Sequence, residues 1–100
     1  MFTEREVADC RRPGGTLDVH GLAARFAAKE ATLKALGADE RALALRSVEV
    51  VVTAGRGLSL ALSGAVAQLA RERGIVRLAV SLTYTARQAC ALVLAWDGSG

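Results

Sequence analysis

The stretch at residues 18–36 constrains the fold more than any other part of the sequence. It is rich in Ala, Leu, Lys and Glu, which favour a helix, and Gly37 follows it as the kind of residue that commonly ends helices. Four apolar residues recur there at helical spacing and are expected to face the core, namely Leu22, Phe26, Leu33 and Leu36. The sequence therefore predicts one long helix against which the other elements pack.

The period of the apolar pattern changes after this helix. A β-branched run at 48–52 predicts a strand, the glycines at 55–57 predict a turn, and the alternation at 58–63 predicts the second strand of a hairpin. Residues 65–73 then predict a helix, with Val66, Leu69 and Ala70 facing inward and Gly74 after its end. Two further strands are predicted, at 76–83 and 89–96.

The remaining segments are predicted to be connections. Residues 1–18 are polar, and Pro13-Gly14-Gly15 indicates a loop, while 39–46 form a charged, Ala-rich connector. The tail at 97–100 is expected to be frayed. The order of helix, two strands, helix and two strands predicts an α+β fold. In it, a small, mostly antiparallel sheet packs with two helices in a single domain over residues 1–100.

Composition and charge exclude several classes of protein. The chain is 52% hydrophobic, but its apolar runs are far shorter than a membrane span needs, and its start shows no secretory signal. We therefore expect no membrane association and a cytoplasmic location. The net charge of +3 includes no basic block and no interleaved aromatic residues, so no nucleic-acid partner is expected. This mild excess fits either a solvated surface or a polyanionic small molecule or acidic protein partner.

The two cysteines show no metal-binding or redox spacing. Cys10 and Cys90 lie far apart, with no CxxC pattern and no nearby histidine motif. Cys90 belongs to an apolar run and is expected to be a buried small hydrophobic residue.

Charged residues are concentrated on the long predicted helix. Glu30 and Lys34 are four residues apart and share one face, and Arg25 and Lys29 share an adjacent stripe. One interpretation is structural, because a Glu followed by Lys at this spacing stabilises a helix by about 0.2–0.5 kcal/mol. The functional interpretation is that the carboxylate binds a divalent cation while the ammonium contacts a phosphate, since Mg²⁺ binds one or two carboxylates together with waters and phosphate oxygens.

The segment RFAAKEATLKALG at 25–37 resembles the signature of the 4′-phosphopantetheinyl transferase superfamily, of the holo-acyl-carrier-protein synthase type. In that signature, a Lys-Glu-Ala triplet precedes a second Lys and a closing Gly. The similarity continues in order along the chain, at residues 2–6, 48–50, 62–65, 80–83 and 89–91. The first of these segments matches the family's phenylalanine–threonine–x–x–glutamate pattern.

The resemblance implies a magnesium-dependent enzyme of fatty acid or polyketide biosynthesis. It would transfer 4′-phosphopantetheine from coenzyme A to a serine of an acyl carrier protein. Glu30 matches the family's metal-binding glutamate, and Lys34 matches the lysine that meets the transferring phosphate. Arg25, Lys29 and Tyr84 are placed by the same resemblance as contacts to coenzyme A or its carrier. Members of this type are similar in forming homotrimers that bind coenzyme A between subunits.

The chain departs from the family pattern at three places. The opening strand, whose aspartate shares Mg²⁺ with the glutamate, is expected to be absent, and no other aspartate is assigned to that role. Tyr84 stands where many relatives have a histidine, and the usual hairpin proline is missing. His20 is expected to be a capping or surface residue. Three interpretations stay open: an active synthase, an inactive relative that binds a carrier protein, and a different enzyme acting on a carrier- or coenzyme A-linked substrate.

Overall fold

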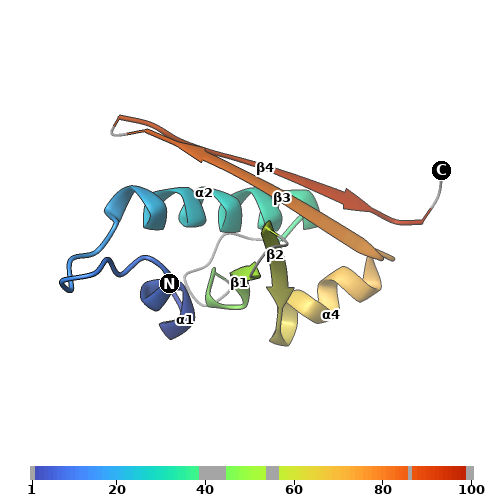
Figure 1. Cartoon of the computed structure of the whole chain (residues 1–100). Helices are drawn as coiled ribbons and strands as arrows, with labels where there is room; N and C mark the ends of the chain where they lie inside the picture. Colours follow the sequence, from blue (N-terminus) through green and yellow to red (C-terminus); the bar gives the residue numbers. More distant parts are fainter. Residues whose placement is uncertain (1, 39–44, 54–56, 86, 99–100) are drawn as a thin grey trace.

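The computed structural model describes residues 2–38, 45–53, 57–85 and 87–98. Most of the connector predicted at 39–46 lies outside the described residues, as do the first two residues of the turn predicted at 55–57 and the end of the tail at 99–100. Element labels follow Figure 1.

The first element is the short helix α1, Glu4–Asp9, which the sequence analysis did not predict. The Thr3 hydroxyl accepts a hydrogen bond from the Glu6 N–H at 3.2 Å, and the Glu6 carboxylate accepts one from the Thr3 N–H at 3.0 Å. This reciprocal capping box satisfies backbone donors that the start of a helix otherwise leaves open. The loop predicted at 13–15 is confirmed, because these residues form a turn and a bend.

The long helix is confirmed as α2, Val19–Leu36. It begins after Asp18, whose carboxylate accepts a hydrogen bond from the Gly21 N–H at 3.1 Å. It ends at Gly37, which adopts a left-handed conformation with φ of 71°. Of the apolar residues expected to face the core, Leu33 and Leu36 are buried, and Leu22 and Phe26 are half-buried.

The strands form two antiparallel hairpins. β1, Val48–Thr53, pairs with β2, Gly57–Leu62, and β3, Arg77–Tyr84, pairs with β4, Ala89–Trp96. Each hairpin is a separate two-stranded sheet among the described residues, although β2 and β3 lie close together. The expectation of one small sheet is corrected accordingly, because no backbone ladder joins the two hairpins there.

Between the hairpins, α4 spans Gly64–Glu72, close to the predicted bounds. Val66 and Ala70 are buried as expected, and Leu69 packs beside them as a partly buried residue. The described helices thus include α1 in addition to the two that the sequence predicts.

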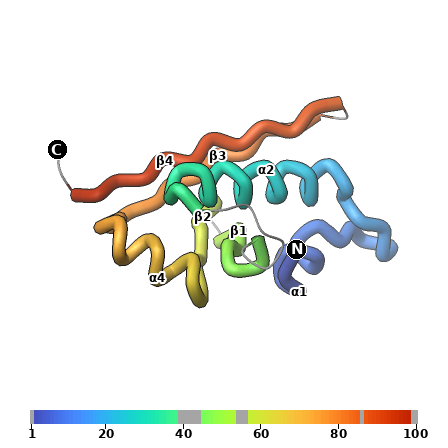
Figure 2. Tube along the Cα trace, turned by 180° about the vertical axis from the view of Figure 1, so that it is seen from behind, coloured from blue at the N-terminus to red at the C-terminus, as the bar shows by residue number. Residues whose placement is uncertain are grey.

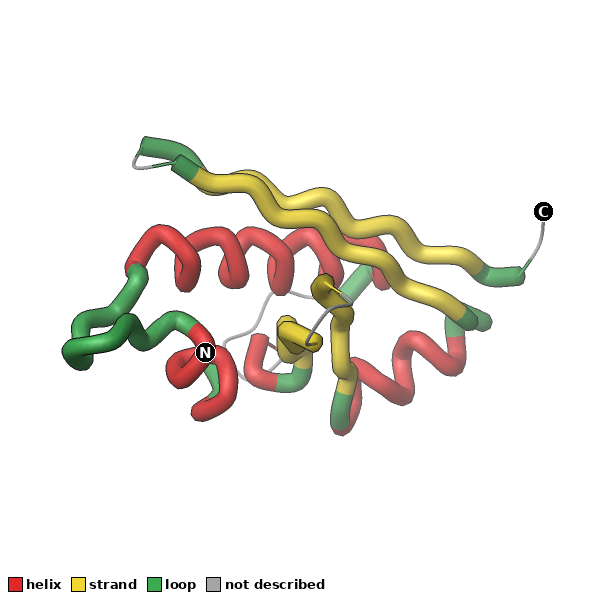
Figure 3. The backbone as a smooth tube through the Cα atoms, in the orientation of Figure 1, coloured by secondary structure: helices red, strands yellow, loops and turns green. Residues whose placement is uncertain are grey.

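The elements are stacked around α2. Figure 1 shows the β3–β4 hairpin over one side of α2, with α1, β1, β2 and α4 on the other side, and Figure 2 shows the same layers from behind. Figure 3 shows the β3–β4 hairpin running along α2, with one end of the β1–β2 hairpin reaching β3. The main apolar cluster lies between α2, β1 and α4 and contains Leu33, Leu36, Leu45, Val48, Val66 and Ala70.

The cysteine that was expected to be buried, Cys90, is exposed. Cys90 is exposed on β4, whereas Cys10 is buried at the end of α1. The pKa of the Cys10 thiol is raised, chiefly because burial disfavours the thiolate. The prediction of a buried Cys90 is wrong because the strand's other face, not this one, is covered by α2.

Candidate functional site

Four of the five predicted site residues lie on α2, where the structure gives them different surroundings. Glu30 is half-buried and Lys34 is exposed, so both are within reach of a ligand. Because they are four residues apart in one continuous helix, they lie on neighbouring turns of the same face. The structure thus keeps together the two residues that the sequence analysis assigned to metal and phosphate.

Lys29 lies in the core and not on the polar helix face that we expected. Its side chain has no exposed surface, and its ammonium lies 2.7 Å from a carboxylate oxygen of Glu6. It also donates hydrogen bonds to the carbonyl oxygens of Leu45 at 2.8 Å and Val48 at 2.6 Å. Three oxygens surround the ammonium, which is the arrangement that a buried charge requires.

Glu6 completes this buried network and was not predicted as a site residue. One carboxylate oxygen accepts the Thr3 N–H, and the other accepts the Val50 N–H at 3.0 Å. The ring of Phe2 lies over the Lys29 ammonium, 5.6 Å from its centroid. The signal for Glu6 was available in the phenylalanine–threonine–x–x–glutamate segment, but its partner lies 23 residues further along the chain, so spacing could not identify it.

Arg25 is also more buried than a surface contact to coenzyme A would require. Its side chain donates a hydrogen bond to the Gly21 carbonyl at 3.1 Å, one turn earlier in α2. Its Nε is buried and has no hydrogen-bond partner in the described part of the chain. The role predicted for Arg25 in binding coenzyme A or its carrier stays a prediction.

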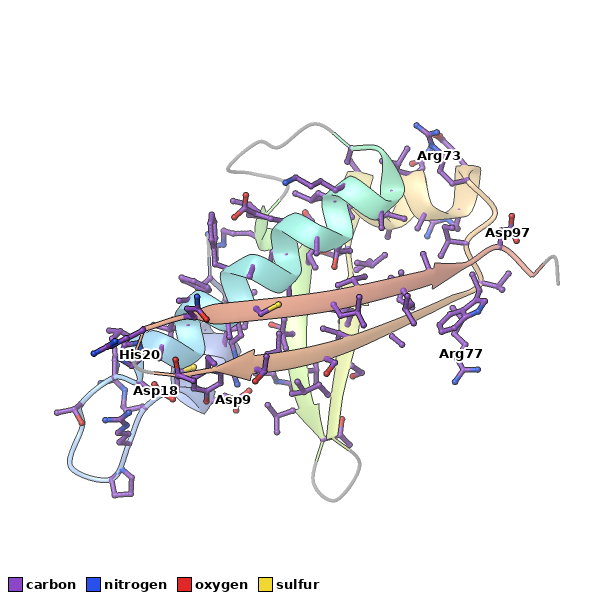
Figure 4. The ribbon with its side chains drawn as sticks, turned by 90° about the horizontal axis from the view of Figure 1, so that it is seen from above. Asp9, Asp18, His20, Arg73, Arg77 and Asp97 are labelled. Atoms are coloured by element: carbon purple, nitrogen blue, oxygen red, sulfur yellow. The ribbon has the colours of Figure 1, made fainter. Side chains whose placement is uncertain are left out.

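Tyr84 lies at the tip of the β3–β4 hairpin, beside the start of α2. Its hydroxyl donates a hydrogen bond to the Asp18 carboxylate at 3.3 Å, although 43% of the residue is exposed. Figure 4 shows Asp18 and His20 gathered at this end of the molecule, with Arg73, Arg77 and Asp97 at the opposite end. His20 is half-buried in the first turn of α2, where Asp18 and not His20 provides the cap.

Asp18, which the sequence analysis did not assign to the site, contacts three other residues. Its carboxylate accepts from Gly21 and Tyr84 and lies 3.3 Å from the guanidinium of Arg12. The Gly21 N–H is the largest cause of a lowered pKa for Asp18, followed among the stabilising contacts by Tyr84 and Arg12. Partial burial and then the negative charge of Asp18 raise the pKa of Tyr84. The phenol therefore stays protonated and able to donate.

The donors for a metal ion are few in the described residues. No group of three or more His, Cys, Asp or Glu side chains comes together there. Glu30 offers a half-buried carboxylate, and a hard cation such as Mg²⁺ is held by one or two carboxylates completed by waters and phosphate oxygens. The Glu30 carboxylate on α2 therefore fits a Mg²⁺ site in which waters and the phosphate oxygens of the substrate provide the other ligands. It does not fit a site whose ligands all come from the protein.

A shallow groove of about 220 Å³ lies elsewhere, between β2, α4 and the start of β3. Its lining is mostly apolar and includes Leu60, Ile75 and Arg77. None of the five predicted site residues lines this groove. The candidate site is therefore the polar surface of α2 around Glu30 and Lys34.

Comparison with known proteins decides the family. A sequence model described as the 4′-phosphopantetheinyl transferase superfamily matches residues 1–93, which is almost the whole chain. The chain belongs to this superfamily. The resemblance drawn from the signature at 25–37 is thereby confirmed.

Named relatives within the superfamily narrow the comparison. The chain is 42% identical over 111 residues to the holo-acyl-carrier-protein synthase of Chloroflexus aggregans, covering all of this chain and 79% of that protein. It is 40% identical over 109 residues to the synthase of the same name from Chloroflexus aurantiacus, covering 98% of this chain and 80% of the relative.

A solved structure agrees with the fold. The acyl carrier protein synthase of Mycobacterium tuberculosis superposes with a TM-score of 0.66 at 31% sequence identity, covering 92% of this chain and 76% of that one. The transferase-like arrangement of helices and antiparallel strands is thus shared beyond the signature helix. No helix in the described ranges is long and apolar enough to cross a membrane.

Proposed function

We propose that this chain is a holo-acyl-carrier-protein synthase, which transfers 4′-phosphopantetheine from coenzyme A to a serine hydroxyl of an acyl carrier protein. One observation carries the proposal: relatives with that name are about 40% identical over nearly the entire chain. The half-buried Glu30 and exposed Lys34, on one face of α2, supply the residue types that the transfer needs.

The reaction breaks the phosphoanhydride bond of the coenzyme A pyrophosphate and forms a phosphoester bond to serine. The serine oxygen attacks the β-phosphorus of the coenzyme A pyrophosphate and loses its proton, while the bond to adenosine 3′,5′-bisphosphate breaks and that group leaves. Such transfers depend mainly on positioning and on neutralising the charge of the phosphoryl oxygens. Lys34 would contact the transferring phosphate with its ammonium, and Glu30 would hold the divalent cation. When bound, Mg²⁺ supplies charge neutralisation at the pyrophosphate.

The other predicted ligand contacts differ in their support. Tyr84 is partly exposed and beside the start of α2, so we retain it as a contact to the nucleotide part of coenzyme A. Arg25 and Lys29 are buried, and Lys29 is surrounded by oxygens of the protein itself. Their burial favours a structural role for the Arg25 and Lys29 side chains over contact with a ligand.

We also propose that the chain works as a homotrimer in the cytoplasm. The trimer is supported by β4, where Leu92, Leu94 and Trp96 are 59%, 48% and 40% exposed on one face of the strand. Exposed apolar side chains in a contiguous row mark surfaces that another chain covers. The cytoplasmic location rests on the substrates proposed above, since coenzyme A and acyl carrier proteins are met there.

The deciding experiment is intact-protein mass spectrometry of an apo acyl carrier protein incubated with the chain, coenzyme A and Mg²⁺. We expect the carrier to gain one phosphopantetheine group. Glu30→Ala should lower the rate at least about 100-fold, because the carboxylate is the protein's donor to the cation that stabilises the transition state.

The matched control is Glu72→Ala, which removes an exposed carboxylate at the end of α4 and should leave the rate unchanged. If the carrier stays unmodified while an authentic transferase converts the same sample, the proposal is wrong. Binding of the unmodified carrier in that case would identify an inactive relative that has kept its partner.

A further inference from the structure

The buried ion pair between Glu6 and Lys29 is not used by the transfer mechanism. Both side chains are 0% exposed, and they join with a 2.7 Å contact between the ammonium and a carboxylate oxygen. Burying two charges carries a desolvation penalty that their attraction often only balances. Apolar residues of similar size fill such positions with equal or greater stability in several proteins, so stability alone is a weak reason for this pair.

The pair joins three parts of the chain through directional contacts: the first segment, α2 and the region of β1. Glu6 receives hydrogen bonds from Thr3 in the first segment and Val50 in β1. Lys29 donates to Leu45, which precedes β1, and to Val48, the first residue of β1. Every one of these contacts is 2.6–3.0 Å long. The network therefore holds α2 in one orientation relative to both the first segment and β1.

The apolar pattern of α2 defines that orientation poorly. The helix is only weakly amphipathic, and it is covered by the β3–β4 hairpin on one side and by α1, β1 and α4 on the other (Figure 1). Much of its surface is alanine, which packs similarly in several rotational settings. A turn of about 100°, the rotation that separates consecutive residues, would bring Glu30 into the inward direction that Lys29 now takes.

We propose that Glu6 and Lys29 are positioning residues for Glu30. By engaging the residue next to Glu30 in the chain, the buried pair sets the rotation of α2 and so holds the Glu30 carboxylate at the surface, where it meets the divalent cation. This inference rests on the metal role proposed above for Glu30. The pair acts through the backbone of α2 and does not touch the substrate.

The test separates positioning from stability with the double variant Glu6→Gln/Lys29→Met. This change leaves no unpaired buried charge, so the chain should fold and unfold thermally within a few degrees of the wild type. The probe is Mn²⁺, a hard cation that carboxylates and phosphate oxygens also bind, titrated by electron paramagnetic resonance with coenzyme A present. The specific part of the binding is the part that Glu30→Gln removes.

We expect the double variant to bind Mn²⁺ at least about tenfold more weakly than the wild type. The Mg²⁺ concentration for half-maximal transfer should rise by a similar factor, while kcat at saturating Mg²⁺ falls less. Glu72→Gln is the control and should change neither quantity, since its carboxylate is exposed on α4. Wild-type Mn²⁺ affinity in a folded double variant would overturn the inference.

Two further outcomes are also decisive. If the double variant does not fold, Glu6→Asp takes its place, because it keeps both charges but shortens the side chain that carries the carboxylate, and a loss of less than about threefold in Mn²⁺ affinity overturns the inference. Failure of the proposed function is recognised separately, because then the wild type leaves the carrier unmodified in the mass spectrum. The Mn²⁺ titration does not depend on that transfer, and Mn²⁺ binding that Glu30→Gln leaves unchanged would also contradict the positioning role.

Discussion

At the scale of single residues, Asp18 joins two segments that are far apart in sequence, the start of α2 and the tip of the β3–β4 hairpin. Its carboxylate caps α2 through Gly21 and receives the Tyr84 hydroxyl from the tip of the β3–β4 hairpin. A side chain that accepts two hydrogen bonds as a carboxylate is favoured in its charged form, which is why its pKa is lowered. Stability should therefore depend on the ionisation of Asp18.

The first prediction follows from the sign of that shift. Because the pKa of Asp18 is lower in the folded chain than its ordinary value of 3.8, its contribution is complete above that value and is lost as the pH falls toward the folded pKa. Melting temperatures measured between pH 6 and pH 2.5 should fall less steeply for Asp18→Asn than for the wild type. Asn still caps the helix but does not titrate. Parallel curves for the two proteins would contradict the assignment.

A second residue-scale prediction concerns the hydrogen bond at the hairpin tip. Tyr84→Phe removes one partly exposed hydroxyl, so the melting temperature should change by only a few degrees. If Tyr84 also contacts the nucleotide, the KM for coenzyme A should rise several-fold while kcat changes little. Steady-state kinetics on the same preparation checks this, and an unchanged KM would remove Tyr84 from the binding site.

At the scale of elements, the end of α2 depends on Gly37. Its φ of 71° lies in the left-handed region that residues with a Cβ adopt at a cost, and the Arg73 guanidinium lies 3.3 Å from the position that a Cβ would occupy. The flexible tip of Arg73 is able to move, whereas the backbone angle is not. The strain, and not the contact, should decide the effect of substitution.

Gly37→Ala should therefore lower the free energy of unfolding by about 1–2 kcal/mol. For a domain of this size, each kcal/mol lost lowers the melting temperature by roughly 4–8 °C. Thermal unfolding followed by circular dichroism measures the change. Gly37→Asn is the matched variant and should lose less, because Asn tolerates the left-handed region better than Ala. Equal losses for Ala and Asn would indicate that contact with Arg73, and not φ, is limiting.

The start of the short helix α1 is marked in the sequence by a capping box and not by an apolar pattern. Thr3 and Glu6 have the spacing of a capping box, and the structure forms both of its hydrogen bonds. The sequence analysis nevertheless predicted no helix here, since six residues are too few for an apolar period to emerge. The same Glu6 carboxylate also binds Lys29, so tertiary contact helps to hold this helix.

At the scale of the whole molecule, β4 presents its larger side chains outward. The residues that alternate toward α2 are half-buried and mostly small, namely Ala89, Ala91, Val93 and Ala95. The small side chains let the helix approach the hairpin closely, while Leu92, Leu94 and Trp96 remain exposed on the far face. A single chain thus leaves its larger apolar residues in this strand uncovered.

Association should depend on that face. Light scattering after gel filtration should give the wild type a mass of about three 10.4-kDa chains. Leu92→Glu should shift the mass toward one chain, because a charge in the middle of an apolar interface is desolvated without a partner. Val19→Glu is the control: Val19 is also an exposed apolar residue, 61% exposed, but lies in the first turn of α2, away from β4. Equal masses for wild type and Leu92→Glu would exclude this face as the interface.

Only part of the candidate site could be predicted from the sequence. Glu30 and Lys34 are identified through the signature of the family, and their spacing of four residues on a helix is enough to place them on one face. Glu6 and the inward direction of Lys29 are not identified in this way. A helix with charges on several sides allows more than one inward face, so the pattern around Lys29 is compatible with either direction.

By itself, the sequence determined the elements whose signals are local. The bounds of α2 follow from the cap at Asp18 and the left-handed Gly37, and β4 was predicted at its observed bounds, because caps and apolar periods depend on residues only a few positions apart. Tertiary structure alone decided that Lys29 points inward to Glu6 and Val48, and that Cys90 lies on an open face. Those outcomes depend on which distant segments cover each surface, and burying a charge is possible only where those segments bring its partners.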